Sequence, residues 1–418
     1  MSIVNCTFSI KKVGCIMAKS PVEVWLWLLL VMQPFNKKTN FILSECNGDA
    51  AQAGRNIRDG KYDFLSDTEK KNAESVRMKD VRELMETCAQ NSVRIITLDD
   101  EEYPPLLRGI EDPPIVLFCA GSLAGLDRLI TLSAVGARNV SDYGINVTHR
   151  MIEPLAKLGI VIISGMAVGS DAEAHRACLA VKGRTIGVLG CGILVNYPAE
   201  NAQLKRDIIA NGGAIISELL PYTKTFGGYF PTRNRIISGM SLGTLVIEAG
   251  ERSGSLLTAR HAAEQNREVF CVPPQDLFST RFNGVVPLLR EDAVPVYNFT
   301  DILNSFSMYF ANEKYIKDYV AEVEKTHHER KEPRKPRDRA KEAAETAADT
   351  KAEITEELLS SLEPREAAVL KLLAEGSAKI DGLIEKSGIG YNELTEILTN
   401  LELAGHIGRG QDGTFSVV

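Results

Sequence analysis

The stretch LITLSAVGARNVSDYGINVTHRMIEPLAKLGIVIISG, residues 129–165, decides the fold. It opens with a short apolar run, passes through a glycine-containing polar turn into a helical stretch, and ends in a second apolar run. Short, uniformly apolar strands separated by helices are typical of a parallel sheet with helices on both faces. The stretch therefore predicts one strand–helix–strand unit of such a sheet.

The same alternation continues toward the C-terminus. The later strand-like runs are TIGVLG, AIISEL, GTLVIEAG, EVFCVP and AVPVYN, with helical stretches between most of them. Two more short strand-like runs lie on the N-terminal side, within residues 92–121. We therefore predict an α/β fold over residues 101–310, an extended Rossmann-like domain with a doubly wound, mainly parallel sheet.

The segments before this domain differ from it in pattern. Residues 20–100 read as apolar and charged helical stretches with polar connections, which predicts a helical domain. Residues 1–19 are expected to be a disordered leader, with Met17 as an alternative start.

The segments after the sheet domain are a linker and a small unit. Residues 323–356 are expected to be a flexible charged linker, because Val, Ile, Leu, Met and Phe are absent between Glu324 and Glu353. Residues 357–418 contain three amphipathic helices and a hairpin, the pattern of a winged helix. Its third helix carries Glu393, Glu396 and Glu402 and neither Lys nor Arg. Because reading the DNA major groove needs basic or amide side chains, we expect a protein contact or a structural role instead.

Composition excludes several classes of protein. The chain of 418 residues is 44% hydrophobic and 25% charged with a net charge of −7, so it is an ordinary globular protein and not a uniformly basic coat for nucleic acid. Its eight cysteines form no C-x-x-C pair, which indicates buried, reduced thiols. The apolar segment 22–32 is too short to span a membrane and lacks the pattern of a signal peptide. We expect a cytoplasmic protein with no membrane partner.

Ligands of an open parallel sheet lie at the carboxyl ends of its strands, where helix N-termini and loops gather. The loops expected there are rich in glycine, arginine, amide and hydroxyl side chains. The residues we assign to this rim are Gly136, Arg138 and Asn139; Ser164, Gly165 and Gly169; Lys224, Phe230, Arg233 and Asn234; and Arg252, Ser253, Gly254 and Ser255.

Single members of this rim also have plain structural explanations. Glycines between a strand and a helix are often turn residues, and Asp171 is equally well placed to cap the helix that it begins. His175 is expected to be structural, and Ser164 lacks the G-x-S-x-G elbow of a nucleophile.

Taken together, the rim predicts a phosphate-binding surface. Backbone N–H groups of glycine-rich loops, serine-rich helix starts and several arginines favour an anion. The chain has neither G-x-G-x-x-G after the first strand nor a P-loop, H-E-x-x-H motif or Cys/His metal cluster. We therefore expect no cofactor, no metal and no catalytic residue. Phosphate contacts spread over several loops, with aromatic side chains among them, favour single-stranded nucleic acid.

The segment GGYFPTRNRIISGMS, residues 227–241, is interpreted as a clamp loop. Pro231 would stiffen the turn, Phe230 would offer a ring face to an unpaired base, and Arg233 would face phosphate. Arg235, further into the following helix, is expected to be structural and to lie near Glu248.

These segments resemble the DNA-processing protein A family (DprA, also called Smf). The resemblance runs in order through YPPLLRGIEDPPIVLFCAG, VGARNVSDYG, SGMAVGSDAEAH, TIGVLGCG, YPAEN, SELLP, YFPTRNRIISGMS, LVIEAGERSGSLLTA and VFCVP. It implies a non-enzymatic protein that binds single-stranded DNA in natural transformation and loads the RecA recombinase onto it. It also implies a sterile-alpha-motif-like (SAM-like) N-terminal domain and a homodimer formed through the C-terminal side of the Rossmann-like domain.

The resemblance implies roles for individual residues and also has departures. Arg138, Phe230, Arg233 and Asn234 would hold phosphate and base, and the remaining rim residues would complete the site. Where the family usually has an arginine this chain has Val168, and where it commonly has a basic residue the chain has Gly227, with Lys224 nearby. Loss of a positive contact weakens binding and flattens its dependence on salt.

An enzyme remains the alternative. GMSLGTLVIEAG, residues 239–250, resembles the PGGxGTxxE loop of lysine-decarboxylase-like hydrolases, which cleave the N-glycosidic bond of nucleoside monophosphates. In that hypothesis Glu248 would act near the sugar and Arg233 would bind the phosphate. Acid–base chemistry also needs a second placed group, which the sequence does not identify.

Overall fold

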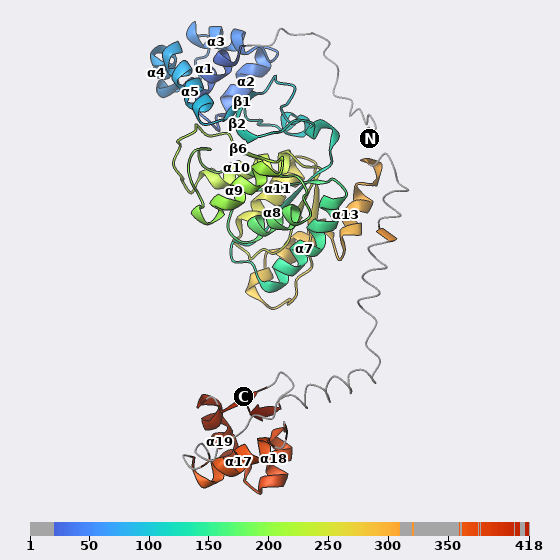
Figure 1. The fold of residues 1–418 in the computed structure, drawn as a ribbon. Helices are drawn as coiled ribbons and strands as arrows, with labels where there is room; N and C mark the ends of the chain where they lie inside the picture. Colours follow the sequence, from blue (N-terminus) through green and yellow to red (C-terminus); the bar gives the residue numbers. More distant parts are fainter. Residues whose placement is uncertain are drawn as a thin grey trace. The chain divides into compact units, whose positions relative to one another are not determined.

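The computed structural model describes residues 21–309, 320–321, 359 and most of 362–417 (Figure 1). The leader expected over residues 1–19 and the linker expected over 323–356 lie outside the described residues. The chain divides into two compact units, Met1–Ala321 and Glu322–Val418, and each is considered by itself.

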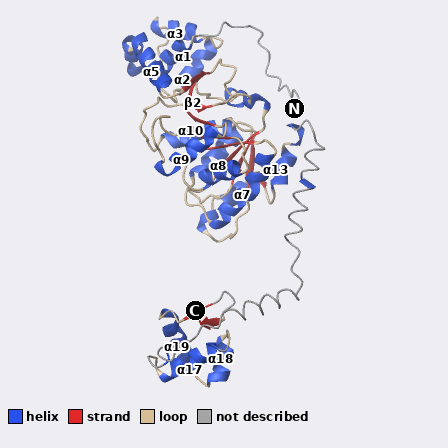
Figure 2. Cartoon of the chain, viewed as in Figure 1, coloured by secondary structure: helices blue, strands red, loops and turns tan. Residues whose placement is uncertain are grey.

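The first unit is built on a nine-stranded sheet with the strand order β1-β2-β6-β5-β4-β3-β7-β8-β9. Figure 2 shows strands of this sheet with helices around them. The strands from β6 to β9 all run parallel, whereas β2 pairs antiparallel with both β1 and β6. The predicted extended, mainly parallel sheet is confirmed. The strands are β1 (Arg94–Thr97), β2 (Val116–Gly121), β3 (Thr131–Val135), β4 (Val161–Ser164), β5 (Thr185–Val188), β6 (Ala214–Ser217), β7 (Gly243–Val246), β8 (Glu268–Cys271) and β9 (Val294–Pro295).

Helices cover both faces of the parallel strands. On one face α7, α8 and α9 contact one another in sequence order, and on the other α10 packs against α11. Buried hydroxyl groups of β3 fix the end of α10, because Ser133 Oγ donates to the carbonyl of Ile237 at 2.6 Å. The helices of this region are α6 (Pro105–Arg108), α7 (Asp142–Lys157), α8 (Ser170–Ala180), α9 (Ala202–Ala210), α10 (Tyr229–Gly239), α11 (Gly254–Glu264), α12 (Val285–Arg290) and α13 (Phe299–Ser305).

In the described part of the chain, five helices precede the sheet and form a helical layer. They are α1 (Val22–Met32), α2 (Lys37–Glu45), α3 (Ala50–Arg58), α4 (Asp67–Ser75) and α5 (Met78–Gln90). The apolar helix α1 is buried by the others along most of its length, which accounts for a sequence that looks membrane-like. None of the described helices is both long and apolar enough to cross a membrane. The core of this layer continues into β2, where Val116 and Phe118 are completely buried.

The second unit has the predicted winged-helix pattern. Its described elements are α17 (Pro364–Ala374), α18 (Ile380–Ser387), α19 (Tyr391–Leu403), β10 (Ile407–Arg409) and β11 (Phe415–Val417). Leu370, Leu383 and Leu394 form its core. The three glutamates expected on the third helix lie on the exposed face of α19.

A buried cluster of charges joins the helical layer to the sheet. Arg235 of α10 donates to both carboxylate oxygens of Glu218, which follows β6, each at 2.8 Å. It also donates to the carbonyl of Asp112 at 3.0 Å, and its guanidinium lies 5.6 Å from the ring centroid of Phe35. The expected pairing of Arg235 with Glu248 is therefore wrong: the carboxylates that pair with Arg235 are those of Glu218 at 2.8 Å and Asp112 at 3.5 Å.

We expect Arg235→Met to destabilise the first unit by about 3–5 kcal/mol. The substitution leaves the buried carboxylate of Glu218 without its cation, and an uncompensated buried charge is costly. Urea unfolding followed by the fluorescence of Trp25 and Trp27 measures the change, since both indoles are buried in the helical layer. The matched control is Arg206→Met on the exposed side of α9, expected to change stability by less than ~0.5 kcal/mol. Equal stability of the two variants would contradict the structural role of the cluster.

Candidate functional site

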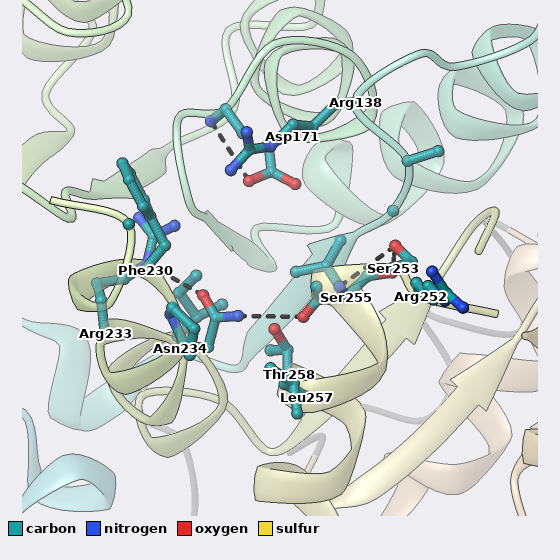
Figure 3. Close-up of a pocket in the computed structure, with 18 of the residues that line it drawn as sticks. Arg138, Asp171, Phe230, Arg233, Asn234, Arg252, Ser253, Ser255, Leu257 and Thr258 are labelled. Atoms are coloured by element: carbon teal, nitrogen blue, oxygen red, sulfur yellow. Dashed lines mark hydrogen bonds between the residues drawn. The ribbon is translucent and has the colours of Figure 1, made fainter. Parts of the chain in front are cut away.

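A pocket of about 890 Å³ lies at the carboxyl ends of β3 and β7 (Figure 3). From β3 the chain adds β4, β5 and β6 on one side of the sheet, and then adds β7 and β8 on the other side. The direction in which strands are added therefore reverses at the β3–β7 pair. In open parallel sheets this reversal leaves a crevice, because the adjoining loops turn to opposite faces. The strand order therefore accounts for the position of the pocket.

Glycines let the loop after β3 lie close to the start of α8. A Cβ atom on Gly136 would lie 2.5 Å from Ser170 Oγ, and one on Gly169 would lie 2.3 Å from the carbonyl oxygen of Arg138. Gly169 also has a φ of +83°, which side chains other than glycine rarely adopt. This close approach brings the exposed Arg138 to the rim of the pocket.

The loop after β7 supplies the opposite wall. Arg252 is exposed, and Ser253 caps α11 by accepting a hydrogen bond from the backbone N–H of Ser255. Gly254 and Thr258 also line the pocket. The wall thus combines an arginine with the positive end of a helix dipole, an arrangement that favours an anion. Among the described residues neither Arg138 nor Arg252 forms an ion pair.

The first turn of α10 forms a third wall. Phe230 is half-buried, with the guanidinium of Arg138 5.6 Å from its ring centroid and the ring of Tyr197 at 5.7 Å. The segment that we interpreted as a clamp loop is therefore largely helix, since α10 begins at Tyr229 and includes Pro231. Figure 3 places Phe230 and Arg233 on one side of the pocket and Arg252 and Ser253 on the other.

Arg233 lines the pocket but is anchored beneath its surface. Its side chain is buried, and its guanidinium donates to the carbonyl of Gly165 at 2.7 Å and to the carbonyl of Val188. Burial lowers the pKa of Arg233 to about 10, partly offset by the nearby charge of Asp171. Arg233 therefore remains a cation near neutral pH and also joins the ends of β4 and β5. The expectation that it simply faces phosphate is incomplete, because its guanidinium makes three hydrogen bonds to the protein, to Gly165, Val188 and Asn234.

Asp171 and Asn234 support the pocket walls. Asn234 Nδ2 donates to the carbonyl of Gly254 at 3.2 Å, and Asn234 Oδ1 accepts from Arg233 Nε at 3.2 Å. The Asp171 carboxylate accepts from the backbone N–H of Gly165 at 3.1 Å and of Ala167 at 3.4 Å. The residue at the cap position of α8 is Gly169, so Asp171 supports the preceding loop and does not act as the helix cap. Burial raises the pKa of Asp171, and the charge of Arg233 opposes that effect.

The structure brings most of the predicted rim together and leaves some members outside. The pocket is lined by Gly136, Arg138, Phe230, Arg233, Asn234, Arg252, Ser253, Gly254 and Ser255. Gly165 lines a small adjoining cleft, whereas Ser164 is buried and donates to the carbonyl of Ala134. Asn139 and Lys224 are exposed but do not line the pocket, and Gly169 lies behind the wall.

The sequence interpretation missed several pocket residues. Thr225, Phe226 and Tyr197 line the pocket without having been assigned to it. Phe226 carried a usable signal, because it is an aromatic residue directly before two glycines in the loop that leads to the site. Tyr197 comes from the loop between β5 and α9 and gave no comparable signal.

Glu248 lies behind the pocket and does not line it. It is completely buried, and its carboxylate accepts from Ser141 Oγ at 2.7 Å and from Arg281 at 3.0 Å. Glu248 therefore joins the start of α7 to the segment after β8. Its partners are Ser141 and Arg281 instead of the expected Arg235.

The described residues offer no metal site. They contain no group of three or more His, Cys, Asp or Glu side chains placed to hold a metal ion. The described cysteines are buried and unpaired, and burial raises the pKa of Cys178 and Cys271 to about 12, so these thiols stay protonated. His175 is also completely buried, with Nδ1 2.7 Å from Thr185 Oγ1. Burial, with a smaller contribution from Arg176, lowers the pKa of His175 to about 3.

Comparison with known proteins identifies the family. The family model described as DNA recombination-mediator protein A matches residues 94–307, and that of the DprA winged helix domain matches residues 341–413. DNA processing protein DprA of Bacillus subtilis (strain 168) is 40% identical over 213 residues, which cover 51% of this chain and 71% of that protein. Protein Smf of Escherichia coli (strain K12) is 37% identical over 258 residues, which cover 60% of this chain and 66% of that protein.

A solved structure extends the similarity to the fold. The X-ray structure of DNA processing protein A from Streptococcus pneumoniae matches with a TM-score of 0.60 and 29% sequence identity, covering 69% of this chain and 98% of that one. Together with the matched sheet and winged-helix regions, these similarities show that the chain belongs to the DNA recombination-mediator protein A (DprA/Smf) family.

Proposed function

We propose that the protein is a non-enzymatic mediator that binds single-stranded DNA in the pocket between β3 and β7 and passes it to the RecA recombinase. The observation that carries the proposal is the pairing of two exposed arginines, Arg138 and Arg252, with an aromatic ring in one pocket at the strand ends. Membership of the family supports a role in DNA processing during natural transformation.

The chemistry of the walls fits a single strand. Arg138, Arg252 and the N-terminus of α11 suit phosphate groups, and the ring of Phe230 suits the face of a base. Bases present free faces when they are unpaired, whereas in a duplex their faces are stacked on one another. Because ring stacking and phosphate contacts do not read base edges, binding should tolerate different sequences.

Partner contacts are a separate part of the proposal. We propose a homodimer through the Rossmann-like unit, supported by exposed apolar side chains after β8, which include Leu277, Phe278, Tyr297 and Met308. The acidic face of α19 suits contact with a protein, because it repels DNA phosphate.

We expect Arg138→Ala and Arg252→Ala each to weaken binding of a labelled oligothymidylate about tenfold, because each removes a charge-assisted contact. The slope of log K against log salt should become shallower by about 0.7 for each arginine removed. Fluorescence anisotropy over a salt series measures both quantities. The control, Arg260→Ala, removes an exposed arginine of α11 that does not line the pocket.

A duplex of the same length should bind far more weakly than the single strand. If the double variant Arg138→Ala/Arg252→Ala kept the full affinity and salt slope, this pocket would not be the DNA site.

The RecA step has its own test. We expect labelled RecA to assemble faster on single-stranded DNA that carries this protein than on bare DNA, and the acceleration should be lost with the Arg138→Ala/Arg252→Ala variant. Stopped-flow fluorescence of RecA at a fixed salt concentration gives the rate. Equal rates with and without the protein would contradict RecA loading while leaving DNA binding intact.

The glycosidase alternative is disfavoured by the surroundings of Glu248. Its carboxylate is bound by Ser141 and Arg281 and does not line the pocket, so it is badly placed to act on a sugar. We therefore expect no free adenine when the protein is incubated with AMP, measured by liquid chromatography with Glu248→Gln as the matched control. Adenine release by the wild type that disappears in this variant would establish the enzyme instead.

A further inference from the structure

Phe226 is an exposed ring at the mouth of the pocket. It lies in the loop between β6 and α10, lines the pocket, and has 64% of its surface exposed. Its ring lies over the backbone of Gly228, where an added Cβ atom would come within 2.7 Å of Cε1. Tyr229 supports the ring by an edge contact, with the centroids 5.3 Å apart and the planes at 71°. An edge contact of this kind leaves ring surface free.

The support behind Phe226 reaches into the helical layer. Tyr229 lies 5.6 Å from the ring of Phe35, which in turn lies 5.6 Å from the guanidinium of the buried Arg235. The loop is therefore backed by side chains that are themselves fixed. Phe226 is thus held at the pocket although most of its surface is open to solvent.

Phe230 occupies a different part of the same pocket. Its ring lies against the backbone of Gly190, where an added Cβ atom would come within 2.6 Å of the ring. Arg138 and Tyr197 also lie near this ring. Phe226 and Phe230 are four residues apart, so their Cα atoms are separated by at most about 14 Å. Both rings are within reach of one short run of nucleotides.

We propose that Phe226 is a second base-stacking platform, so that the pocket takes two unpaired bases of one strand, one on Phe230 and one on Phe226. This inference rests on the proposed single-stranded DNA function. The pocket volume of about 890 Å³ is near the upper end of the range of roughly 300–1,000 Å³ for sites that enclose drug-sized ligands. The segment 225–229 has no charged side chain. We therefore expect it to contact the bases of the strand and not the phosphate groups.

The experiment compares Phe226→Leu with wild type in oligothymidylate binding over a salt series. Leucine keeps the apolar bulk but removes the flat ring. We expect binding to weaken roughly tenfold, because stacking of a base on an aromatic ring contributes ~1–3 kcal/mol. The salt slope should stay unchanged, since no phosphate contact is lost. Phe226→Trp should restore the affinity.

The matched control is Phe41→Leu in the helical layer. Phe41 is also exposed and also makes an edge contact with a neighbouring ring, that of Phe64 at 5.6 Å. This variant should bind DNA like wild type.

A second measurement tests whether the contact of Phe226 is with a base. Oligonucleotides of minimal binding length, each with one abasic position, should show two positions at which loss of the base weakens binding to wild type. For the Phe226→Leu variant, only one of these two abasic positions should still weaken binding.

The outcomes separate this inference from the proposed function. If wild type binds single-stranded DNA and Phe226→Leu binds equally well, the second platform is overturned while the DNA site stands. A loss of affinity that comes with a shallower salt slope overturns it as well, because phosphate contacts would then be involved. If wild type itself fails to bind single-stranded DNA, the proposed function fails first.

Discussion

The buried ion pair between Arg235 and Glu218 is the interaction on which the arrangement of the site depends. Arg235 also bonds the backbone of Asp112 and lies beside Phe35, so one guanidinium contacts α10, the end of β6, the connection before β2 and the helical layer. Buried charges tolerate little displacement, because each must keep its partner. The pair therefore fixes the rotation and depth of α10. Phe230 and Arg233 lie in the first two turns of that helix, so their positions follow from the same constraint.

The arginines near the pocket divide into two kinds. Arg233 and Arg235 are buried and donate hydrogen bonds to protein carbonyls and carboxylates, whereas Arg138 and Arg252 are exposed at the rim. Buried cations preorganise the walls, and exposed ones remain available to an anion from solvent. The walls are held in place by buried hydrogen bonds, and the rim carries exposed positive charge. Such a pocket suits a flexible, anionic ligand, because the protein itself loses little conformational freedom on binding.

Much of the fold could be predicted from the sequence, because strand and helix patterns are local. The alternation after residue 129 led to the parallel sheet, and the two terminal domains were expected from their helical patterns. Helix α3 gives a weak signal in the sequence, since its buried apolar face consists of the small residues Ala50, Ala53 and Gly54 with Ile57 as its only large apolar member. The start of α10 was taken for a loop because Pro231 and two glycines read as turn residues, although proline is well tolerated in the first turn of a helix. The pairing of Arg235 failed because a choice between Glu218 and Glu248 depends on the path of the whole chain. The roles of the individual rim residues in DNA binding stay predictions.

The core shared between the helical layer and the sheet has a consequence for biosynthesis. The cluster that contains α1 also includes Phe118 of β2 and is packed by Ile193, Leu194 and Leu220. A ribosome that makes the chain from its N-terminus delivers all five helices well before it delivers Leu220. Until then the apolar side of the helical layer that faces these residues stays uncovered, and β2 lacks its neighbour β6. Nascent chains of this length therefore present an open strand edge beside an apolar surface, which are features that molecular chaperones bind.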